Sequence, residues 1–402
     1  PEFVNDGEWC YPSGDELFEP IANKNHNSDL PILAITQDKG AVPRDMIDYH
    51  VSVTDKSVES YKVVEIGDFI ISLRSFQGGI EYSFYKGLCS PAYIILRKKI
   101  NLENDFYRHY FKSVPFIRDL NRNLEGIRDG KMISYKQFSE ILIPKPKLKE
   151  QQKIASCLSS LDEVITAESQ KLEMLKDHKK GLLQNLFPQE GETVPKLRFK
   201  EFEGSGEWAL DAFSEYIKLY RGSSPRPIQN YFTTDESGVN WIKIGDTKNA
   251  DNFIIKQVEE RITPEGAEKS RKVNVGELIL ANSMSFGKTY QLAIEGYIYD
   301  GWFVLREYEK HFDKHFLLQL LNSDYMQSQY KKLSAGGIVQ NISSDIVYNT
   351  TLPHTSLNEQ KRIATCLSSI DEIISAQSQK VEALKLHKKG LLQGLFPGVN
   401  EI

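Results

Sequence analysis

A long segment of this sequence occurs twice, and the repeat restricts the possible folds more than any other feature. Residues 150–188 and 359–397 are identical at 28 of 39 positions without a gap, at an offset of 209 residues. Outside the two copies the same offset gives only faint matches, such as Gly67-Asp68 with Gly276-Glu277. Each half therefore consists of one diverged globular unit followed by one nearly identical segment.

The repeated segment is predicted to be a long helix. Apolar or small residues alternate in steps of four and three from Ile154 to Leu186 and from Ile363 to Leu395. This spacing of 3.5 residues is typical of a left-handed coiled-coil seam. Polar residues interrupt the seam at the same two positions of each copy, which are Glu168 and Lys179 in the first and Gln377 and Lys388 in the second. Because one such helix cannot bury its seam alone, we expect the two to pair, antiparallel about a pseudo-two-fold axis.

The ends of these helices also carry signals. The stretch Ser356-Leu357-Asn358-Glu359 fits a capping box, whereas the first copy has Lys147 at the cap position. Phe187-Pro188 and Phe396-Pro397 are expected to end the two helices.

Composition and charge exclude several classes of protein. The 402 residues are 40% hydrophobic and 26% charged, which fits two or three globular domains. Fifty basic and fifty-five acidic residues give a net charge of -5, which excludes a protein that coats nucleic acid by bulk positive charge. No apolar run approaches the length of a membrane span, and no signal peptide is recognisable. Because the sequence begins with Pro1 rather than Met, we expect the natural N-terminus to lie upstream.

The four cysteines lie far apart and form no CxxC pair, which disfavours disulfides and structural zinc. We therefore expect a cytoplasmic protein without a cofactor or a metal ion.

Short β-rich runs and few helices make the globular units mixed in structure, with helices expected at Asp105–Ser113 and Lys314–Lys332. We predict an α+β fold in which two pseudo-symmetric α/β globular domains are separated by two long antiparallel coiled-coil helices. The predicted boundaries are 1–146 for the first domain, 147–188 for the first helix, 189–208 for a linker, 209–355 for the second domain and 356–397 for the second helix.

Motifs that carry catalysis are missing. The sequence has no GxGxxG, GxxxxGK[ST], HExxH or GxSxG pattern and no Asn/Asp-Pro-Pro-aromatic motif. His311 and His315 have the spacing of a zinc pair, but lysines flank them, and we interpret them as an exposed helix face. His178 and His387 lie within the lysine-rich last turns of the two expected helices and are better suited to the helix C-terminus or to a partner than to a metal.

Polar loops punctuate both units, with the residue types that read DNA. Arg and Lys can contact guanine in the major groove, Asn and Gln can pair with adenine, and glycines let backbone amides approach phosphates. The alternative for any single residue is an ordinary solvated loop.

The chain resembles a known family, the specificity (S) subunits of type I restriction–modification systems. The resemblance rests on the two copies of Lys-Lys-Gly-Leu-Leu-Gln-x-Leu-Phe-Pro and on the Pro195-Lys196-Leu197-Arg198-Phe199 entry to the second unit, and it covers essentially the whole chain. Arg221-Gly222-Ser223-Ser224-Pro225 also matches, whereas the first unit has no clear Gly-x-x-Pro equivalent around Asn23–Pro31.

The resemblance implies that each globular unit is a target recognition domain that reads one half of a bipartite double-stranded DNA site. The paired helices would set the spacing between the half-sites and dock two methyltransferase (M) subunits, whose core recruits two motor-nuclease (R) subunits. The chain itself would be a non-catalytic subunit of this DNA adenine methyltransferase and restriction endonuclease complex.

Two sets of residues follow as candidates. Those for DNA contact are Gln37, Lys39, Arg44, Arg74, Gln77, Arg128, Lys131, Arg221, Ser223, Arg226, Lys243, Asn282, Ser285, Lys288 and Gln340. Those for contact with the M subunits, chosen as exposed residues shared by the two helices, are Gln170, Lys171, His178, Lys179, Gln379, Lys380, His387 and Lys388.

Two other functions remain open. A stand-alone DNA-binding regulator would bind its site tightly without M, and a coiled-coil scaffold protein would show no dependence on DNA.

Overall fold

The computed structural model describes residues 8–47, 58–122, 133–283, 287–334 and 341–396. The chain divides into two compact units. Unit 1 contains Pro1–Ser169 and Gln379–Ile402, and unit 2 contains Gln170–Ser378. Each unit therefore holds one globular domain and one half of each long helix.

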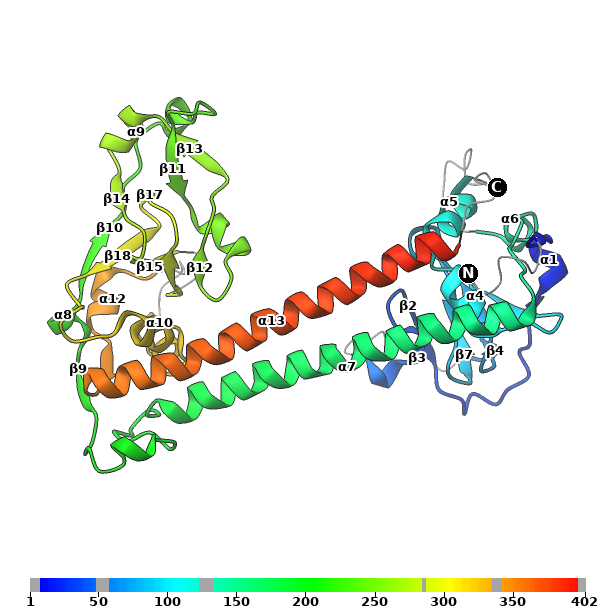
Figure 1. Ribbon diagram of the computed structural model, residues 1–402, viewed down its shortest axis with the longest axis horizontal. Coiled ribbons are helices and arrows are strands. Elements are labelled where there is room, and N and C mark those ends of the chain that lie inside the picture. Colours follow the sequence, from blue (N-terminus) through cyan, green and yellow to red (C-terminus); the bar gives the residue numbers. More distant parts are fainter. Residues whose placement is uncertain (1–7, 48–57, 123–132, 284–286, 335–340, 397–402) are drawn as a thin grey trace. The chain divides into compact units, whose positions relative to one another are not determined.

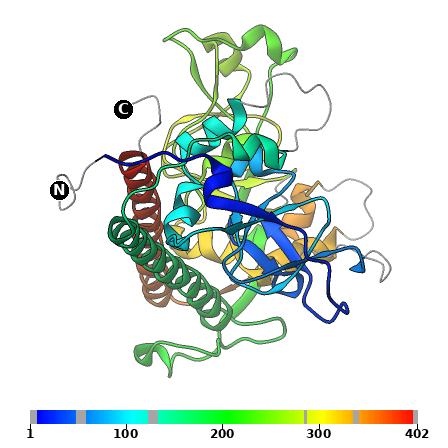
Figure 2. The same ribbon diagram turned by 90° about the vertical axis from the view of Figure 1, so that its right-hand side faces the viewer.

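The two copies of the repeat form the helices α7 (Leu148–Leu186) and α13 (Leu357–Leu395), of 39 residues each. Within unit 1 the first half of α7 and the second half of α13 run side by side in opposite directions, and within unit 2 the complementary halves do the same (Figures 1 and 2). The predicted antiparallel pairing is confirmed. Among the described residues, no helix is both long enough and apolar enough to cross a membrane.

Ion pairs across the helix seam occupy some of the predicted polar positions. In unit 1, Lys388 of α13 binds Asp162 of α7, and in unit 2, Lys179 of α7 lies 2.6 Å from Asp371 of α13. The offset of 209 residues relates both members of one pair to the members of the other. A charge within a seam is stable only opposite its counter-charge, so the two pairs fix one register between the helices.

The domain of unit 1 is built around a small antiparallel sheet in the order β1-β8-β5-β6, with two further two-stranded ribbons, β2-β3 and β4-β7. Its elements are α1 (Gly14–Leu17), β1 (Phe18–Ile21), β2 (Leu33–Thr36), β3 (Gly40–Pro43), η1 (Arg44–Met46), β4 (Lys62–Val64), β5 (Phe69–Ile71), α3 (Ser75–Gly78), β6 (Glu81–Tyr82), β7 (Gly87–Cys89), β8 (Ile94–Lys98), α4 (Asn104–Tyr110), α5 (Val114–Arg122) and α6 (Tyr135–Ser139).

The domain of unit 2 repeats the strand order as β10-β18-β15-β16, extended by β12, and adds a second sheet in the order β13-β11-β17-β14. Its elements are η2 (Lys200–Phe202), β9 (Ala209–Ala212), α8 (Phe213–Tyr216), β10 (Lys218–Arg221), η3 (Ile228–Tyr231), β11 (Val239–Ile242), η4 (Ile244–Asn249), β12 (Ile254–Ile255), β13 (Glu260–Ile262), α9 (Pro264–Glu268), β14 (Arg271–Val273), β15 (Leu278–Ala281), β16 (Thr289–Leu292), β17 (Gly296–Ile298), β18 (Trp302–Arg306), α10 (Lys314–Asn322), α11 (Asp324–Leu333), α12 (Ser344–Tyr348) and β19 (Thr351–His354), the last of which pairs with β9.

The core of each domain continues onto the long helices. In unit 1, Phe396 at the end of α13 packs on Phe106 of α4, and in unit 2, Phe187 after α7 packs on Phe316 of α10, each with ring centroids 5.3 Å apart. The Phe-Pro that ends each repeat is therefore an anchor for the neighbouring domain as well as a stop signal.

The helix expected at Lys314–Lys332 is two helices, α10 and α11, separated at Ser323. Ser323 has extended backbone angles, and its hydroxyl donates to the Leu320 carbonyl while accepting from the Met326 amide. This N-cap competes with the helical periodicity and starts a second helix.

A repeated glutamine joins each long helix to its domain. The side chain of Gln151 accepts from the Glu103 amide, which caps α4, and donates to the Pro146 carbonyl. Gln360 makes the corresponding bonds, accepting from the Asp313 amide at the cap of α10 and donating to the Thr355 carbonyl. The two domains thus sit on the helices through the same polar contact.

A buried histidine makes unit 1 sensitive to acid. His109 of α4 lies against Ser159 and 3.9 Å from the Asp162 carboxylate, and burial, aided by Arg108 and Lys388, lowers its pKa to about 3. An unfolded histidine has a pKa near 6.5, so below that pH the unfolded chain binds a proton that the folded chain does not. The free energy of unfolding of unit 1 therefore falls as the pH drops below about 6.5.

We expect unit 1 to lose roughly 1 kcal/mol of stability between pH 7 and 5.5 through this residue. Hydrogen exchange of the α4 amides at different pH values measures this loss. The control is His109→Gln, because Gln319 holds the corresponding position in α10, six residues after the N-cap of its helix. An equal pH dependence in the variant would contradict the assignment.

Candidate nucleic-acid interface

Each domain has a polar cleft at the same edge of its central sheet. In unit 1 the cleft lies beyond the end of β5, and in unit 2 it lies beyond the end of β15. The cleft of unit 1 has a volume of about 670 Å³ and that of unit 2 about 340 Å³. The strands that place the clefts are alike, whereas the residues that line them differ.

The cleft of unit 1 brings together three of the predicted DNA-contact residues. Gln37 comes from the β2-β3 turn, Arg44 follows β3, and Arg74 follows β5. Lys39 lies exposed in the same turn as Gln37, and Gln77 lies exposed on α3. Arg128 and Lys131 lie outside the described residues.

A buried ion pair holds the loops of this cleft. The Lys112 ammonium lies 2.5 Å from the Glu81 carboxylate and also donates to the backbone carbonyls of Gln37 and Gly78. Burial raises the pKa of Glu81 and lowers that of Lys112. The pair is stable because each charge offsets the desolvation of the other, and it ties the β2-β3 turn to α3.

The cleft of unit 2 brings together Arg221 and Asn282, with Asp300 as their common anchor. The Asp300 carbonyl accepts from Arg221 Nε at 3.2 Å and from Asn282 Nδ2 at 2.8 Å. Its carboxylate accepts from Ser224 and lies 3.8 Å from the exposed guanidinium of Arg226. This cluster holds the Arg221 loop rigid while leaving Arg226 able to reach a ligand.

The remaining candidates of unit 2 are dispersed. Ser223 donates to the Lys269 carbonyl, and Lys243 forms an ion pair with Glu260. Lys288 is half-buried near Phe253, and burial lowers its pKa. Ser285 and Gln340 lie outside the described residues.

Sequence reasoning missed several lining residues. These are Ser72, Ser90 and Tyr93 in unit 1 and Asn341, Ser343 and Ser344 in unit 2. Asn341 could have been found, because in the sequence it directly follows Gly336, Gly337 and Gln340, a composition typical of a polar loop, whereas the others carry no local signal. Asp300 was missed because the candidates were chosen for contact with DNA, and an acidic residue was not expected to hold the basic side chains in place.

The candidates for partner contact fall into two groups. Gln170, Lys171, His178, Gln379, Lys380 and His387 are exposed. Lys179 and Lys388, which the sequence placed both at polar seam positions and among the exposed candidates, lie in the seam, where the ion pairs described above hold them.

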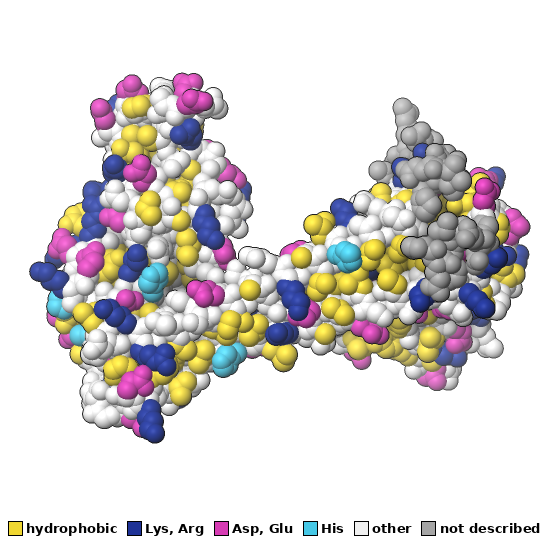
Figure 3. All heavy atoms as spheres, viewed as in Figure 1, with side chains coloured by type: hydrophobic (Ala, Val, Ile, Leu, Met, Phe, Trp, Pro, Cys, Tyr) yellow, Lys and Arg dark blue, Asp and Glu magenta, His cyan; other side chains and the backbone are white. Residues whose placement is uncertain are grey.

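The structure adds a set of exposed residues on the long helices, which we call the outer stripe. Its members share the same steps of four and three on both helices, and all are exposed: Ser160, Val164, Ala167, Lys171, Met174 and His178 on α7, and Ser369, Ile373, Ala376, Lys380, Ala383 and His387 on α13. Figure 3 shows apolar side chains at the surface along the helices, and intermixed acidic and basic side chains elsewhere on the face in view. An exposed row at coiled-coil spacing, with Val164, Met174 and Ile373 as its large apolar members, is suited to packing against further helices.

The described residues contain no group of three or more His, Cys, Asp or Glu side chains placed to hold a metal ion.

Comparison with known proteins identifies the family. The model of the type I restriction modification DNA specificity domain matches residues 17–177 and 218–386, that is, both halves of the chain. The chain belongs to this family. The predicted resemblance to type I specificity subunits is confirmed.

Individual relatives of this DNA specificity family cover nearly the whole chain. The type I restriction enzyme MjaVIII specificity subunit of Methanocaldococcus jannaschii is 26% identical over 365 residues, which are 87% of this chain and 81% of that protein. The specificity subunit named for restriction enzyme MjaX of the same organism is 23% identical over 414 residues, 99% of this chain and 91% of that one.

Solved structures share the fold. A chain from a study of complex assembly and conformational transition in the type I R-M system matches with a TM-score of 0.61 and 17% identity, over 97% of this chain and 98% of that one. The type I S subunit from M. genitalium matches with a TM-score of 0.53 and 14% identity, over 98% and 97%. The α+β architecture with two domains and two long helices is thus confirmed.

Proposed function

We propose that this chain selects the DNA target of a type I restriction–modification complex, with each domain reading one half of a bipartite site. The observation that carries the proposal is the pair of clefts at the same edge of two matching sheets, lined by different side chains. A bipartite site with two different half-sites requires two different recognition surfaces in one chain. The functional domains would be residues 1–146 and 209–355.

The side chains at these edges suit base reading. The cleft of unit 1 offers one glutamine and two arginines, and that of unit 2 is lined by one arginine and two asparagines, of which Asn282 is only 5% exposed and Asn341 is exposed. Arginine can contact guanine with two hydrogen bonds, and asparagine or glutamine can contact adenine in the same way. All fifteen predicted DNA contacts keep this role in the proposal.

Two methyltransferase (M) subunits would dock on the repeated helices, one for each half, and their core would recruit two motor-nuclease (R) subunits. The outer stripe supports this, since surfaces that meet identical partners stay alike while the reading surfaces diverge. Adenine methylation and DNA cleavage would then belong to these partners.

The net charge of -5 fits a shared interface with DNA. Phosphate neutralisation would come largely from the M subunits, while this chain supplies base contacts and a few cationic anchors. We further propose a cytoplasmic location, in keeping with its four free cysteines.

Methylation mapping tests the function directly. In cells that express this chain with its M subunit, we expect methylated adenines within one split motif, on both strands. Tight sequence-specific binding by the chain alone would favour a regulator instead, and methylation or binding that ignores the chain would favour a scaffold.

Arg74 and Arg226 provide a matched test of the two recognition surfaces. Both side chains are exposed: Arg74 lines the cleft of unit 1, and Arg226 lies near Asp300, which anchors Arg221 in unit 2. We expect Arg74→Ala and Arg226→Ala each to weaken discrimination about 10-fold at one base of one half-site, a different half for each. The same methylation maps measure it, and each variant is the control for the other. A change in both halves from one substitution would contradict the modular assignment.

A further inference from the structure

Exposed apolar side chains that recur in both halves are rare in this molecule. Among the described residues, two pairs of large exposed apolar side chains are related by the offset of 209 residues. The first is Val164 with Ile373, in the outer stripe, which are 44% and 50% exposed. The second is Ile66 with Val275, which are 67% and 64% exposed and lie in the globular domains.

The second pair sits on the turn that precedes β5 and β15, and in unit 1 this turn is rigid. Gly67 has a φ of 95°, and its amide donates to the Ser83 carbonyl at 2.9 Å. The Asp68 carboxylate accepts from the Glu65 amide and binds the Arg97 guanidinium through two bonds of 2.7 Å.

The turn of unit 2 repeats these contacts. Gly276 has a φ of 86°, and its amide donates to the Leu292 carbonyl at 2.7 Å. The Glu277 carboxylate accepts from the Asn274 amide and binds the Arg306 guanidinium. The two domains otherwise share little sequence, yet they keep this turn in full.

The turn itself does not require an apolar residue at its tip. The glycine supplies the left-handed conformation, and the acid and the arginine lock the turn. The side chains of Ile66 and Val275 point outward, where a polar residue would serve the fold equally well. An apolar residue is nevertheless present at the exposed tip of both turns, and a contact outside the chain would account for its recurrence.

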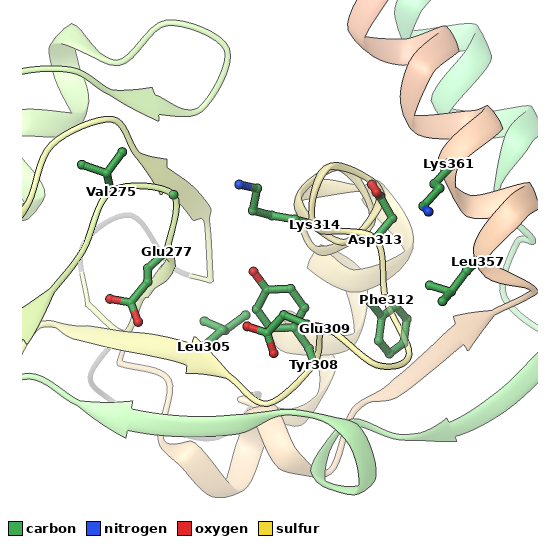
Figure 4. A pocket seen from close by; sticks show the side chains of 11 residues that line it. Val275, Glu277, Leu305, Tyr308, Glu309, Phe312, Asp313, Lys314, Leu357 and Lys361 are labelled. Carbon is green, nitrogen blue, oxygen red and sulfur yellow. The ribbon is translucent and has the colours of Figure 1, made fainter.

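The surroundings of Val275 form a receptive surface. A hollow of about 470 Å³ adjoins the turn, and Figure 4 shows Lys314 of α10 directed toward the turn, with Leu357 and Lys361 of α13 on the far side. The hollow thus reaches from the turn to the exposed start of a long helix. Leu357 lies sixteen residues before Ile373, which is about 24 Å along α13.

We propose that this turn is a second docking point for the M subunit, contacted through Ile66 in unit 1 and Val275 in unit 2. A partner that meets both halves in the same way explains why the turn is retained in two diverged domains. Contact with DNA does not explain the apolar residue at both tips. The bases differ between the half-sites, and a branched apolar side chain gains little from a phosphate. One subunit that contacts both the turn and the outer stripe of the same unit would meet each half in the same way. This inference rests on the proposed function.

The test uses the full-length chain with its M subunit. Ile66→Ser, Val275→Ser and the double variant are compared with Val114→Ser, which removes an exposed apolar side chain without an apolar counterpart in unit 2. Native mass spectrometry gives the stoichiometry, titration gives the affinity, and thermal unfolding checks the fold. We expect each single variant to bind one of its two M subunits about 10-fold more weakly, the double variant both, and Val114→Ser neither.

Unchanged M binding by the double variant would overturn the inference, as would a loss of DNA affinity with M binding intact. If the double variant keeps both M subunits, but a charge introduced into the outer stripe, as in Ile373→Asp, releases one, then the inference fails and the proposed function stands. If the unmodified chain binds no M at all, the proposed function fails with it.

Discussion

Ile373→Asp is expected to release one M subunit from the complex and to leave the other bound. Ile373 is a half-exposed apolar member of the outer stripe, and Val164 takes its place on α7. In a helix–helix interface this position would be fully desolvated, and a carboxylate there would lack a counter-charge. Such a substitution costs about 3 kcal/mol or more, so the affinity of that site should fall at least about 100-fold.

Leu386→Asp is the matched control. Leu386 is an exposed leucine on the same helix, but it lies outside the outer stripe, and the corresponding residue of α7 is Asp177. The substitution therefore copies what the other half already carries and should leave both M subunits bound. Methylation should fail with Ile373→Asp and persist with Leu386→Asp. A complex that keeps two M subunits with Ile373→Asp would contradict docking on the outer stripe.

The long helices were predictable because their signal is local. A period of 3.5 residues, two polar interruptions and a Phe-Pro stop gave both helices to within a few residues. The capping box at Ser356 is only half formed, however. Ser356 accepts from the Glu359 amide, but the Glu359 carboxylate binds Arg198 of the linker instead. Local sequence could not show that a distant arginine would take this carboxylate.

The candidate clefts were only partly predictable. Residue type alone pointed to Gln37 and Arg74, but their proximity depends on how β2, β3 and β5 are arranged, which is a long-range property. The outer stripe, by contrast, has the same spacing as the seam and could have been read from the sequence. The sequence marked only Lys171 and His178 and their counterparts on the second helix, because the other members are mostly small or polar and a single apolar pair such as Val164 and Ile373 gives a weak periodic signal.

The contact between Arg198 and Glu359 leads to a second prediction with a large effect. Arg198 Nε and Nη2 each lie 2.8 Å from one oxygen of Glu359, and the side chains are 7% and 1% exposed. The hydrogen bonds to Glu359 raise the pKa of Arg198 further above its ordinary value, so this charge is permanent. Thr355 also donates to Glu359, and Arg198 donates to the Gly206 carbonyl. The pair thus joins the linker to the first turn of α13.

Arg198→Met is expected to destabilise unit 2 by about 3–5 kcal/mol, because it leaves the buried Glu359 carboxylate without its counter-charge. Denaturant unfolding followed by tryptophan fluorescence measures this, since Trp208, Trp241 and Trp302 all lie in unit 2. The double variant Arg198→Met/Glu359→Met should recover much of the loss, because a buried pair replaced by apolar residues leaves no unpaired charge. Lys256→Met breaks an exposed pair with Asp251 and should cost less than about 1 kcal/mol. Two outcomes would contradict this: Arg198→Met costing no more than Lys256→Met, or a double variant no more stable than Arg198→Met alone. Either would mean that the charge pair does not hold the linker, and that the packing of Trp208 against Phe187 holds it instead.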